Sequence, residues 1–306
     1  MIYVIVGPTG SGKTFVANQI ACHFDLPILN ADAFQIYKGM DIGSAKIEKT
    51  DENYERYHLL DLVCPDEDFS VKQFQGIFRK TLDEILSLGK DVVVCGGTGL
   101  YIKASLYDYV FDEFDDDTSD LEGLPNDELY SMLVRLDPKS AELIHPNNKK
   151  RVIRAISIAR KGNETKSENI ESQEHKLIYS NVRFLMLDPD REALYSNINK
   201  RVDEMFERGL VQETDSLMSF YELSRTARQA IGYKEVISYL NDEMTLEECK
   251  ELVKKRTRNY AKRQWTFFNN QFPVEKYKNI EDLLKEVLKD EWYFWTFKRP
   301  SWRRKM

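Results

Sequence analysis

The chain has 306 residues, of which 42% are hydrophobic and 31% charged, and its formal net charge is −7 at pH 7. This length suits one large α/β domain with a smaller appendage, and no apolar run approaches the roughly 20 residues of a membrane span. The four cysteines lie far apart without CxxC spacing, which argues against a zinc site or a disulfide framework. The first residues read as a buried strand and lack the charged start and cleavage site of a signal peptide, so we expect a cytoplasmic protein. We also predict a monomer that makes no contact with a membrane.

The N-terminal third alternates between apolar runs and helical patterns. The expected elements are strands at residues 2–6, 27–30, 59–63 and 92–95, a helix at residues 12–23, and a helix from the capping box at Ser70 to about Gly89. This alternation predicts an α/β fold class: a P-loop core with a parallel sheet flanked by helices. Gly7, Asp32 and Gly96 then fall at the carboxyl ends of strands, where such sheets bind their ligands.

The alternation breaks at Tyr107, which indicates an insertion. We predict a mainly helical insertion domain at residues 110–180, and a core domain formed by residues 1–109 and 181–306. The elements expected after the break are helices at residues 126–136 and 148–161, a polar loop at 162–176, a strand at 183–187, and helices at 190–209 and 245–270.

Charge is unevenly distributed along the chain. The segment from Asp108 to Glu128 holds ten acidic residues and no Lys or Arg, so the remainder is slightly basic. Basic residues gather at 149–161, at 254–263 and in the tail at 298–305. Such clusters fit a surface that binds a polyanion, although each alone is also typical of a solvated helix face.

The strongest motif lies between the first strand and the first helix. It matches G-x-x-x-x-G-K-[ST] and comprises Gly7, Pro8, Thr9, Gly10, Ser11, Gly12, Lys13 and Thr14. In this motif the backbone N–H groups and the helix N-terminus hold phosphate oxygens, the lysine neutralises charge, and the threonine hydroxyl binds Mg²⁺. The motif predicts a phosphate site with Thr14 as the metal ligand.

The motif does not identify the phosphate compound. Most P-loops bind ATP or GTP and move the terminal phosphoryl group. Here the strand at residues 92–95 is followed by Gly-Gly-Thr-Gly and not by the aspartate of a Walker B motif. A small-molecule kinase is therefore the alternative that depends on the glycine-rich loop alone.

Further blocks resemble the tRNA dimethylallyltransferase family, also called tRNA isopentenyltransferases. The longest is N-A-D-A-F-Q-I-Y-K-G-M-D-I-G-S-A-K at residues 30–46. Other matching blocks are H-L-L-D at 58–61, G-G-T-G-L-Y at 96–101, D-P at 137–138 with H-P-N at 145–147, K-R-V-I-R at 150–154, N-K-R-V-D at 199–203, A-I-G-Y-K at 230–234 and T-R-N-Y-A-K-R-Q at 257–264. The resemblance covers residues 7 to about 270.

The resemblance implies that the P-loop holds a leaving pyrophosphate. The donor would be dimethylallyl diphosphate with Mg²⁺ as the cofactor, and the acceptor would be N6 of adenosine 37 in the tRNA anticodon stem-loop. The target base must leave its stack to be reached. Because no cysteine follows Cys249, the zinc finger of the eukaryotic relatives is not expected, and the bacterial type is indicated.

Three residues are the catalytic candidates by position in the family motifs. Asp32 would act as the general base towards the adenine amine. Arg201, together with Lys13 and Mg²⁺, would stabilise the leaving pyrophosphate, and Thr98 would contact the target nucleotide. The chain has Asn197 where the family often has an arginine, so more of this charge neutralisation is expected to fall on Arg201.

The resemblance also supplies a set of candidate tRNA-binding residues. They are Asp32, Ala33, Phe34, Gln35, Thr98, Lys150, Arg151, Arg154, Gly232, Tyr233, Lys234, Lys262, Arg263 and Gln264. The aromatic residues after them, at positions 265, 267 and 268, are expected to belong mainly to the core. Two alternatives stay open beside the kinase: prenyl transfer to free AMP or ADP, and a non-catalytic RNA-binding protein.

Overall fold

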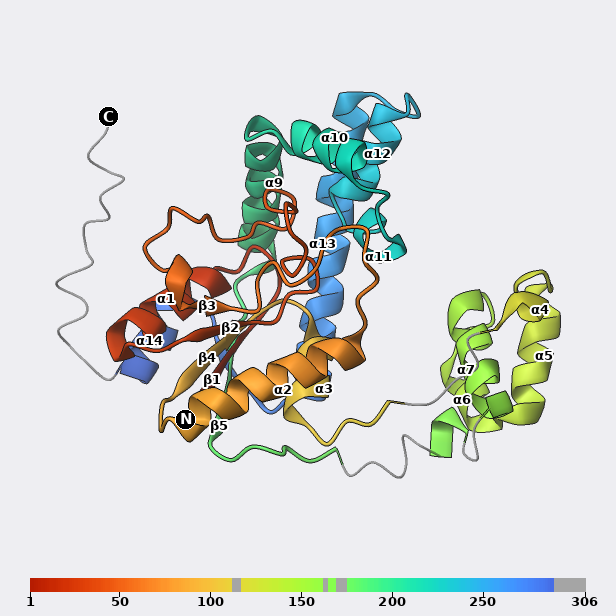
Figure 1. The fold of residues 1–306 in the computed structure, drawn as a ribbon, viewed down its shortest axis with the longest axis horizontal. Coiled ribbons are helices and arrows are strands. Elements are labelled where there is room, and N and C mark those ends of the chain that lie inside the picture. Colours follow the sequence, from red (N-terminus) through yellow and green to blue (C-terminus); the bar gives the residue numbers. More distant parts are fainter. Residues whose placement is uncertain (112–116, 162–164, 169–174, 289–306) are drawn as a thin grey trace. The chain divides into compact units, whose positions relative to one another are not determined.

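The computed structural model describes residues 1–111, 117–161, 165–168 and 175–288. The chain divides into two compact units (Figure 1). The larger unit contains Met1–Ser105 and the segment from Tyr179 onward, and the smaller unit is Leu106–Ile178. The acidic segment lies partly, and the basic tail entirely, outside the described residues.

The larger unit is built on a six-stranded parallel sheet with the order β3-β2-β4-β1-β5-β6. The strands are β1 (Ile2–Val6), β2 (Ile28–Asn30), β3 (Tyr57–His58), β4 (Val92–Cys95), β5 (Val182–Leu187) and β6 (Val274–Tyr277). β1 lies inside the sheet, where four of its five residues are buried, and it pairs with β4 on one side and β5 on the other. The predicted α/β fold is confirmed.

Two strands differ from expectation. The prediction of a strand at residues 59–63 is wrong, because β3 ends at His58 and the backbone then turns. Leu59 and Asp61 have φ values of 66° and 52°, in the left-handed region that no strand contains. β6 was not predicted; it lies at the sheet edge, none of its four residues is buried and two are charged, so its apolar pattern is weak.

Helices connect and cover the strands. Those of the larger unit are α1 (Lys13–Phe24), α2 (Val71–Ser87), α3 (Gly99–Leu106), α9 (Arg191–Glu207), α10 (Leu210–Phe220), α11 (Arg225–Arg228), α12 (Tyr233–Leu240), α13 (Leu246–Gln271) and α14 (Ile280–Leu288), with a short 3₁₀ turn at Tyr54–Arg56. The capping boxes predicted at Ser70 and Thr245 are present, and each begins its helix as expected.

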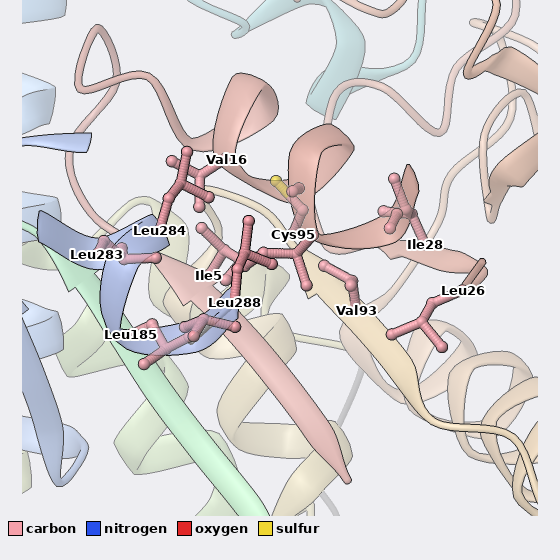
Figure 2. Packing of buried hydrophobic residues seen from close by; sticks show 14 of the residues in the cluster. Ile5, Val16, Leu26, Ile28, Val93, Cys95, Leu185, Leu283, Leu284 and Leu288 are labelled. Carbon is pink, nitrogen blue, oxygen red and sulfur yellow. The ribbon is translucent and has the colours of Figure 1, made fainter. Parts of the chain in front are cut away.

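A continuous apolar core lies between the sheet, α1 and α14 (Figure 2). Ile5, Val93 and Leu185 project from three neighbouring strands towards Val16 of α1 and Leu284 of α14. Successive side chains alternate across a sheet, so the other residues of each strand face the opposite side. This packing fixes the start of α1, and hence the P-loop, relative to the strand ends.

The smaller unit has its own core. Its helices are α4 (Ser119–Glu122), α5 (Asn126–Leu136), α6 (Pro138–Leu143) and α7 (Lys149–Lys161), and α5 packs against α6 and α7. The helix predicted at 126–136 is confirmed, and the one predicted at 148–161 begins one residue later. Residues 166–168 of the expected loop form a helical turn, and most of that loop lies outside the described residues. None of the described helices is long and apolar enough to cross a membrane.

Candidate active site

The P-loop connects β1 to α1 and contains three glycines with positive φ angles. Gly7, Gly10 and Gly12 have φ values of 141°, 81° and 96°. A Cβ atom on Gly7 would lie 2.7 Å from the carbonyl oxygen of Leu187, so a larger residue there would displace β5. The Lys13 ammonium donates to the Pro8 carbonyl at 2.9 Å, which holds the side chain over the loop. The loop thus lies between a strand and a helix, which is the context that the sequence motif requires.

A second loop closes against the P-loop from the end of β4. Gly96 approaches the backbone after β2 so closely that a Cβ atom would lie 2.1 Å from the Ala31 carbonyl oxygen. The Thr98 hydroxyl accepts a hydrogen bond from the Ala33 amide at 2.9 Å. Asp32 accepts one from the Phe34 amide at 3.0 Å through Oδ1. These contacts hold Asp32 at the carboxyl ends of β2 and β4.

Gln264 of α13 joins the two loops. Its side-chain oxygen accepts from the Thr9 amide at 2.8 Å, and its side-chain nitrogen donates to the Gly97 carbonyl at 2.9 Å. Gln264 is buried. Its amide is therefore used inside the protein, where it fixes the distance between the P-loop and the loop that carries Thr98.

The two loops, the segment after β2 and α9 enclose a polar cavity. It is lined by Thr9, Lys13, Thr14, Asn30, Asp32, Gln35, Ser44, Ala45, Ile47, Tyr57, Cys95, Gly96, Gly97, Arg201, Tyr260 and Gln264. Asp32, Lys13 and Arg201, which the sequence placed in three separate motifs, thus share one cavity. Oδ2 of Asp32 has no hydrogen-bond partner among the residues that the structure describes, and it faces Gly97.

Burial shapes the electrostatics of this cavity. It lowers the pKa of Lys13 to about 8, with nearby Arg201 acting in the same direction. It also lowers the pKa of Arg201, while the carboxylate of Asp32 opposes that shift. Burial also raises the pKa of the Cys95 thiol in the cavity lining to about 12, so Cys95 stays neutral. Burial disfavours the charged forms of Lys13 and Arg201, and a bound anion would offset that cost. The cavity is therefore suited to a multiply charged anion.

An apolar slot adjoins the polar cavity and shares Thr9, Asp32, Ser44, Arg201 and Tyr260 with it. The remaining lining residues are mostly apolar and come from α9, α13 and two loops: Phe34, Gly43, Ile198, Val202, Met205, Ile231, Gly232, Val253 and Thr257. A ligand with a charged head and a short hydrocarbon tail would fit this combination of surfaces.

An oxygen donor suited to Mg²⁺ is present at the P-loop. Thr14 is exposed at the start of α1 and lines the polar cavity. Mg²⁺ usually takes one or two protein oxygens, substrate phosphates and water, and the Thr14 hydroxyl fits that pattern.

Tyr233, like Gln264, is a predicted tRNA-binding residue that packing explains better, so its prediction as a direct tRNA contact is corrected. Tyr233 is buried, and its hydroxyl donates to Glu213 at 2.6 Å. A buried ring cannot reach a macromolecule. Its neighbour Gly232 lines the apolar slot, and Lys234 donates to Gln229 at 2.8 Å on the surface.

α13 presents only part of its predicted basic cluster to solvent. Lys254 pairs with Asp203 at 2.8 Å, and Arg256 pairs with the buried Glu235. Lys262 and Arg263 are exposed. Of the three predicted tRNA-binding residues on this helix, these two remain candidates for a direct RNA contact, since Gln264 is internal.

The aromatic residues of α13 have different environments. Phe268 is buried as expected, and Phe267 packs against Gly99. Trp265, expected in the core, is 43% exposed and donates from its indole nitrogen to Asp188 at 2.7 Å. It belongs to the surface because it follows Lys262 by three residues and lies on the same helix face.

The smaller unit carries the other predicted basic residues on α7. Lys150 and Arg151 are exposed, and Arg154 is half-buried. Val152 and Ile156 point into the core of this unit. The helix therefore presents basic side chains on one face and apolar ones on the other.

Several residues of the site were not predicted from the sequence. Ile198, Met205 and Val253 line the apolar slot, and Tyr260 borders both cavities. Met205 follows Ile198 by seven residues on one face of α9, so the helical periodicity of the sequence predicts that both are buried on the same side. Periodicity does not distinguish residues that line a cavity from residues of the core.

Comparison with known proteins gives consistent relatives. A family model described as IPP transferase matches residues 35–271. The tRNA dimethylallyltransferase of Anoxybacillus flavithermus is 42% identical over 93% of this chain and 92% of its own length, and that of Bacillus subtilis is 38% identical over 95% and 94%.

Solved structures agree with these relatives. A tRNA delta(2)-isopentenylpyrophosphate transferase from Staphylococcus epidermidis has a TM-score of 0.67 and 36% identity over 98% of this chain and 99% of its own. A eukaryotic dimethylallyltransferase acting on tRNA has a TM-score of 0.78 and 29% identity over 94% of this chain and 76% of its own.

Proposed function

This chain belongs to the IPP transferase family, and we propose that it transfers the dimethylallyl group of dimethylallyl diphosphate to N6 of adenosine 37 in tRNA. The products are N6-isopentenyladenosine and pyrophosphate. The observation that supports this most directly is the meeting of Asp32, Lys13 and Arg201 beside an apolar slot. A kinase would also use the cations, whereas a prenyl diphosphate accounts for both the cations and the apolar slot.

The diphosphate of the donor would lie in the P-loop. Backbone N–H groups at the start of a helix attract such an anion, and Lys13 and Arg201, which line the cavity, would neutralise its charge. Mg²⁺ held by Thr14 would supply further charge neutralisation on the leaving pyrophosphate. The dimethylallyl group would occupy the slot beside Met205 and Val253.

Asp32 would accept the proton that N6 loses. As the bond between the allylic carbon and the diphosphate oxygen breaks, the N6 lone pair forms the new carbon–nitrogen bond, and the N6 proton passes to the carboxylate. Oδ1 of Asp32 accepts from the Phe34 amide, and Oδ2, on the side of Gly97 in the cavity lining, would take the proton. An adenine amine is a poor nucleophile, so a placed base contributes directly to the rate.

The tRNA would be held by exposed basic residues. Lys262 and Arg263 lie on the same helix as Tyr260, which borders the cavity, and Lys150 and Arg151 are on α7 of the smaller unit. The target adenosine must leave the anticodon-loop stack to reach Asp32.

The test is incorporation of label from radiolabelled dimethylallyl diphosphate. Unmodified tRNA containing adenosine 37 is the acceptor, AMP is the competing acceptor, and a tRNA with guanosine at position 37 is the control. We expect label in the first RNA only. Label in AMP alone would replace this proposal with a free-nucleotide prenyltransferase, and consumption of ATP without any label would indicate a kinase.

A further inference from the structure

The loop of residues 41–45 forms a wall of both cavities. Gly43 and Ser44 line the apolar slot, and Ser44 and Ala45 line the polar cavity. Gln35, which also borders the polar cavity, donates from its side-chain amide to the carbonyls of Ser44 and Ala45 at 3.2 and 3.3 Å. The position of this loop therefore determines the shape of the space proposed for the donor.

The loop does not hold this conformation through its own backbone alone. Ala45 has a φ of 48°, a left-handed value that is unfavourable for a residue with a Cβ atom. The amides of Asp41, Ile42 and Gly43 all point to one place. Converging N–H groups attract an anion and destabilise a loop that lacks one.

A carboxylate from α10 occupies that place. Glu213 accepts from the amide of Asp41 at 3.1 Å, of Ile42 at 2.8 Å and of Gly43 at 3.2 Å. It also accepts from the hydroxyl of the buried Tyr233 at 2.6 Å. We propose that Glu213 is a positioning residue, which sets the donor site by anchoring the 41–45 loop without touching the substrate.

Tyr233 makes this anchor rigid. Its ring lies so close to Gly43 that a Cβ atom there would be 2.5 Å from the ring carbon Cε2. The other end of the loop is fixed separately: Lys46, which is buried, donates to Asp41 and Asp61 at 2.6 Å each. The loop is thus held at its ends by Lys46 and along its backbone by Glu213.

The inference rests on the proposed function, and its test uses the same assay with the full chain. Glu213→Gln keeps the size of the side chain but places an NH₂ group against the converging amides. We expect the KM for dimethylallyl diphosphate to rise by about tenfold or more, with the KM for tRNA changing less than about twofold. A merely structural role would lower the active fraction and leave both KM values unchanged.

Three further variants make the test specific. Asp215→Asn is the matched control: it removes an exposed carboxylate two residues along α10 and should leave both KM values as in the wild type. Glu213→Asp keeps the charge and should restore part of the donor affinity. Tyr233→Phe removes one of the four donors and should raise the donor KM by less than Glu213→Gln, which gives a readout even if Glu213→Gln folds poorly.

The outcomes separate the two proposals. An inactive wild type would refute the proposed function. With an active wild type, an unchanged donor KM in folded Glu213→Gln and Tyr233→Phe would overturn the positioning role. An equal rise in the donor KM of Asp215→Asn would overturn it as well, because the effect would then be one of surface charge.

Discussion

The Asp32→Asn variant tests the chemical step most directly. Asparagine has nearly the same shape and keeps an oxygen for the Phe34 amide, which bonds Oδ1 at 3.0 Å in the wild type. The loop after β2 should therefore stay in place. What is lost is the oxygen facing the cavity that can take a proton. General-base catalysis contributes about 10²–10⁴-fold, so we expect kcat to fall by that factor, which corresponds to about 3–5 kcal/mol.

The Asp32→Asn substitution should not weaken binding of the donor, although it slows the chemical step. Asp32 is a negative charge beside Lys13 and Arg201, so its removal leaves the two cations to the diphosphate alone. The KM for the donor should stay the same or fall. Single-turnover incorporation of label into tRNA, at several donor concentrations, measures both quantities. A loss in kcat smaller than about tenfold, or a raised donor KM, would refute the assignment of Asp32 as the base.

Four further predictions concern other parts of the molecule. Because burial lowers the pKa of Lys13 to about 8, kcat/KM for the donor should fall as pH rises through about 8, and a Lys13→Met variant should be weak without that inflection. Met205→Ala should enlarge the slot and raise the rate with geranyl diphosphate relative to dimethylallyl diphosphate, in a competition assay. Replacing Lys150 and Arg151 by alanine should weaken tRNA binding. It should also reduce the slope of the logarithm of the binding constant against the logarithm of salt concentration by up to about two, measured by filter binding at graded salt. Leu283→Ala should lower the free energy of unfolding by about 2–5 kcal/mol in urea titrations, because Leu283 is fully buried.

The sequence predicted the elements that local signals specify. The glycines of the P-loop, the four apolar residues of β4 and the capping box at Ser70 each define an element through neighbouring residues only. The motif positions of Asp32, Lys13 and Arg201 likewise lie together in one cavity.

Features that depend on distant contacts were missed. Tyr233 looked available for tRNA, but α10 supplies the carboxylate that buries its hydroxyl. Gln264 looked like a surface residue of a basic helix, and it instead joins loops separated from it by more than 160 residues. β6 and the strand at residues 57–58 are short and lack alternation, so tertiary pairing decides them.

The strand order has a consequence for the folding of the protein during its synthesis on the ribosome. β1 carries the P-loop, yet one of its two partners is β5, and β5 is in turn paired with β6 at residues 274–277. The phosphate-binding end of the sheet therefore stays incomplete until almost the whole chain has been synthesised. The smaller unit has its own core and can fold before the sheet of the larger unit is complete. We expect nascent chains that end before β5 to have a protease-resistant insertion and an unformed P-loop.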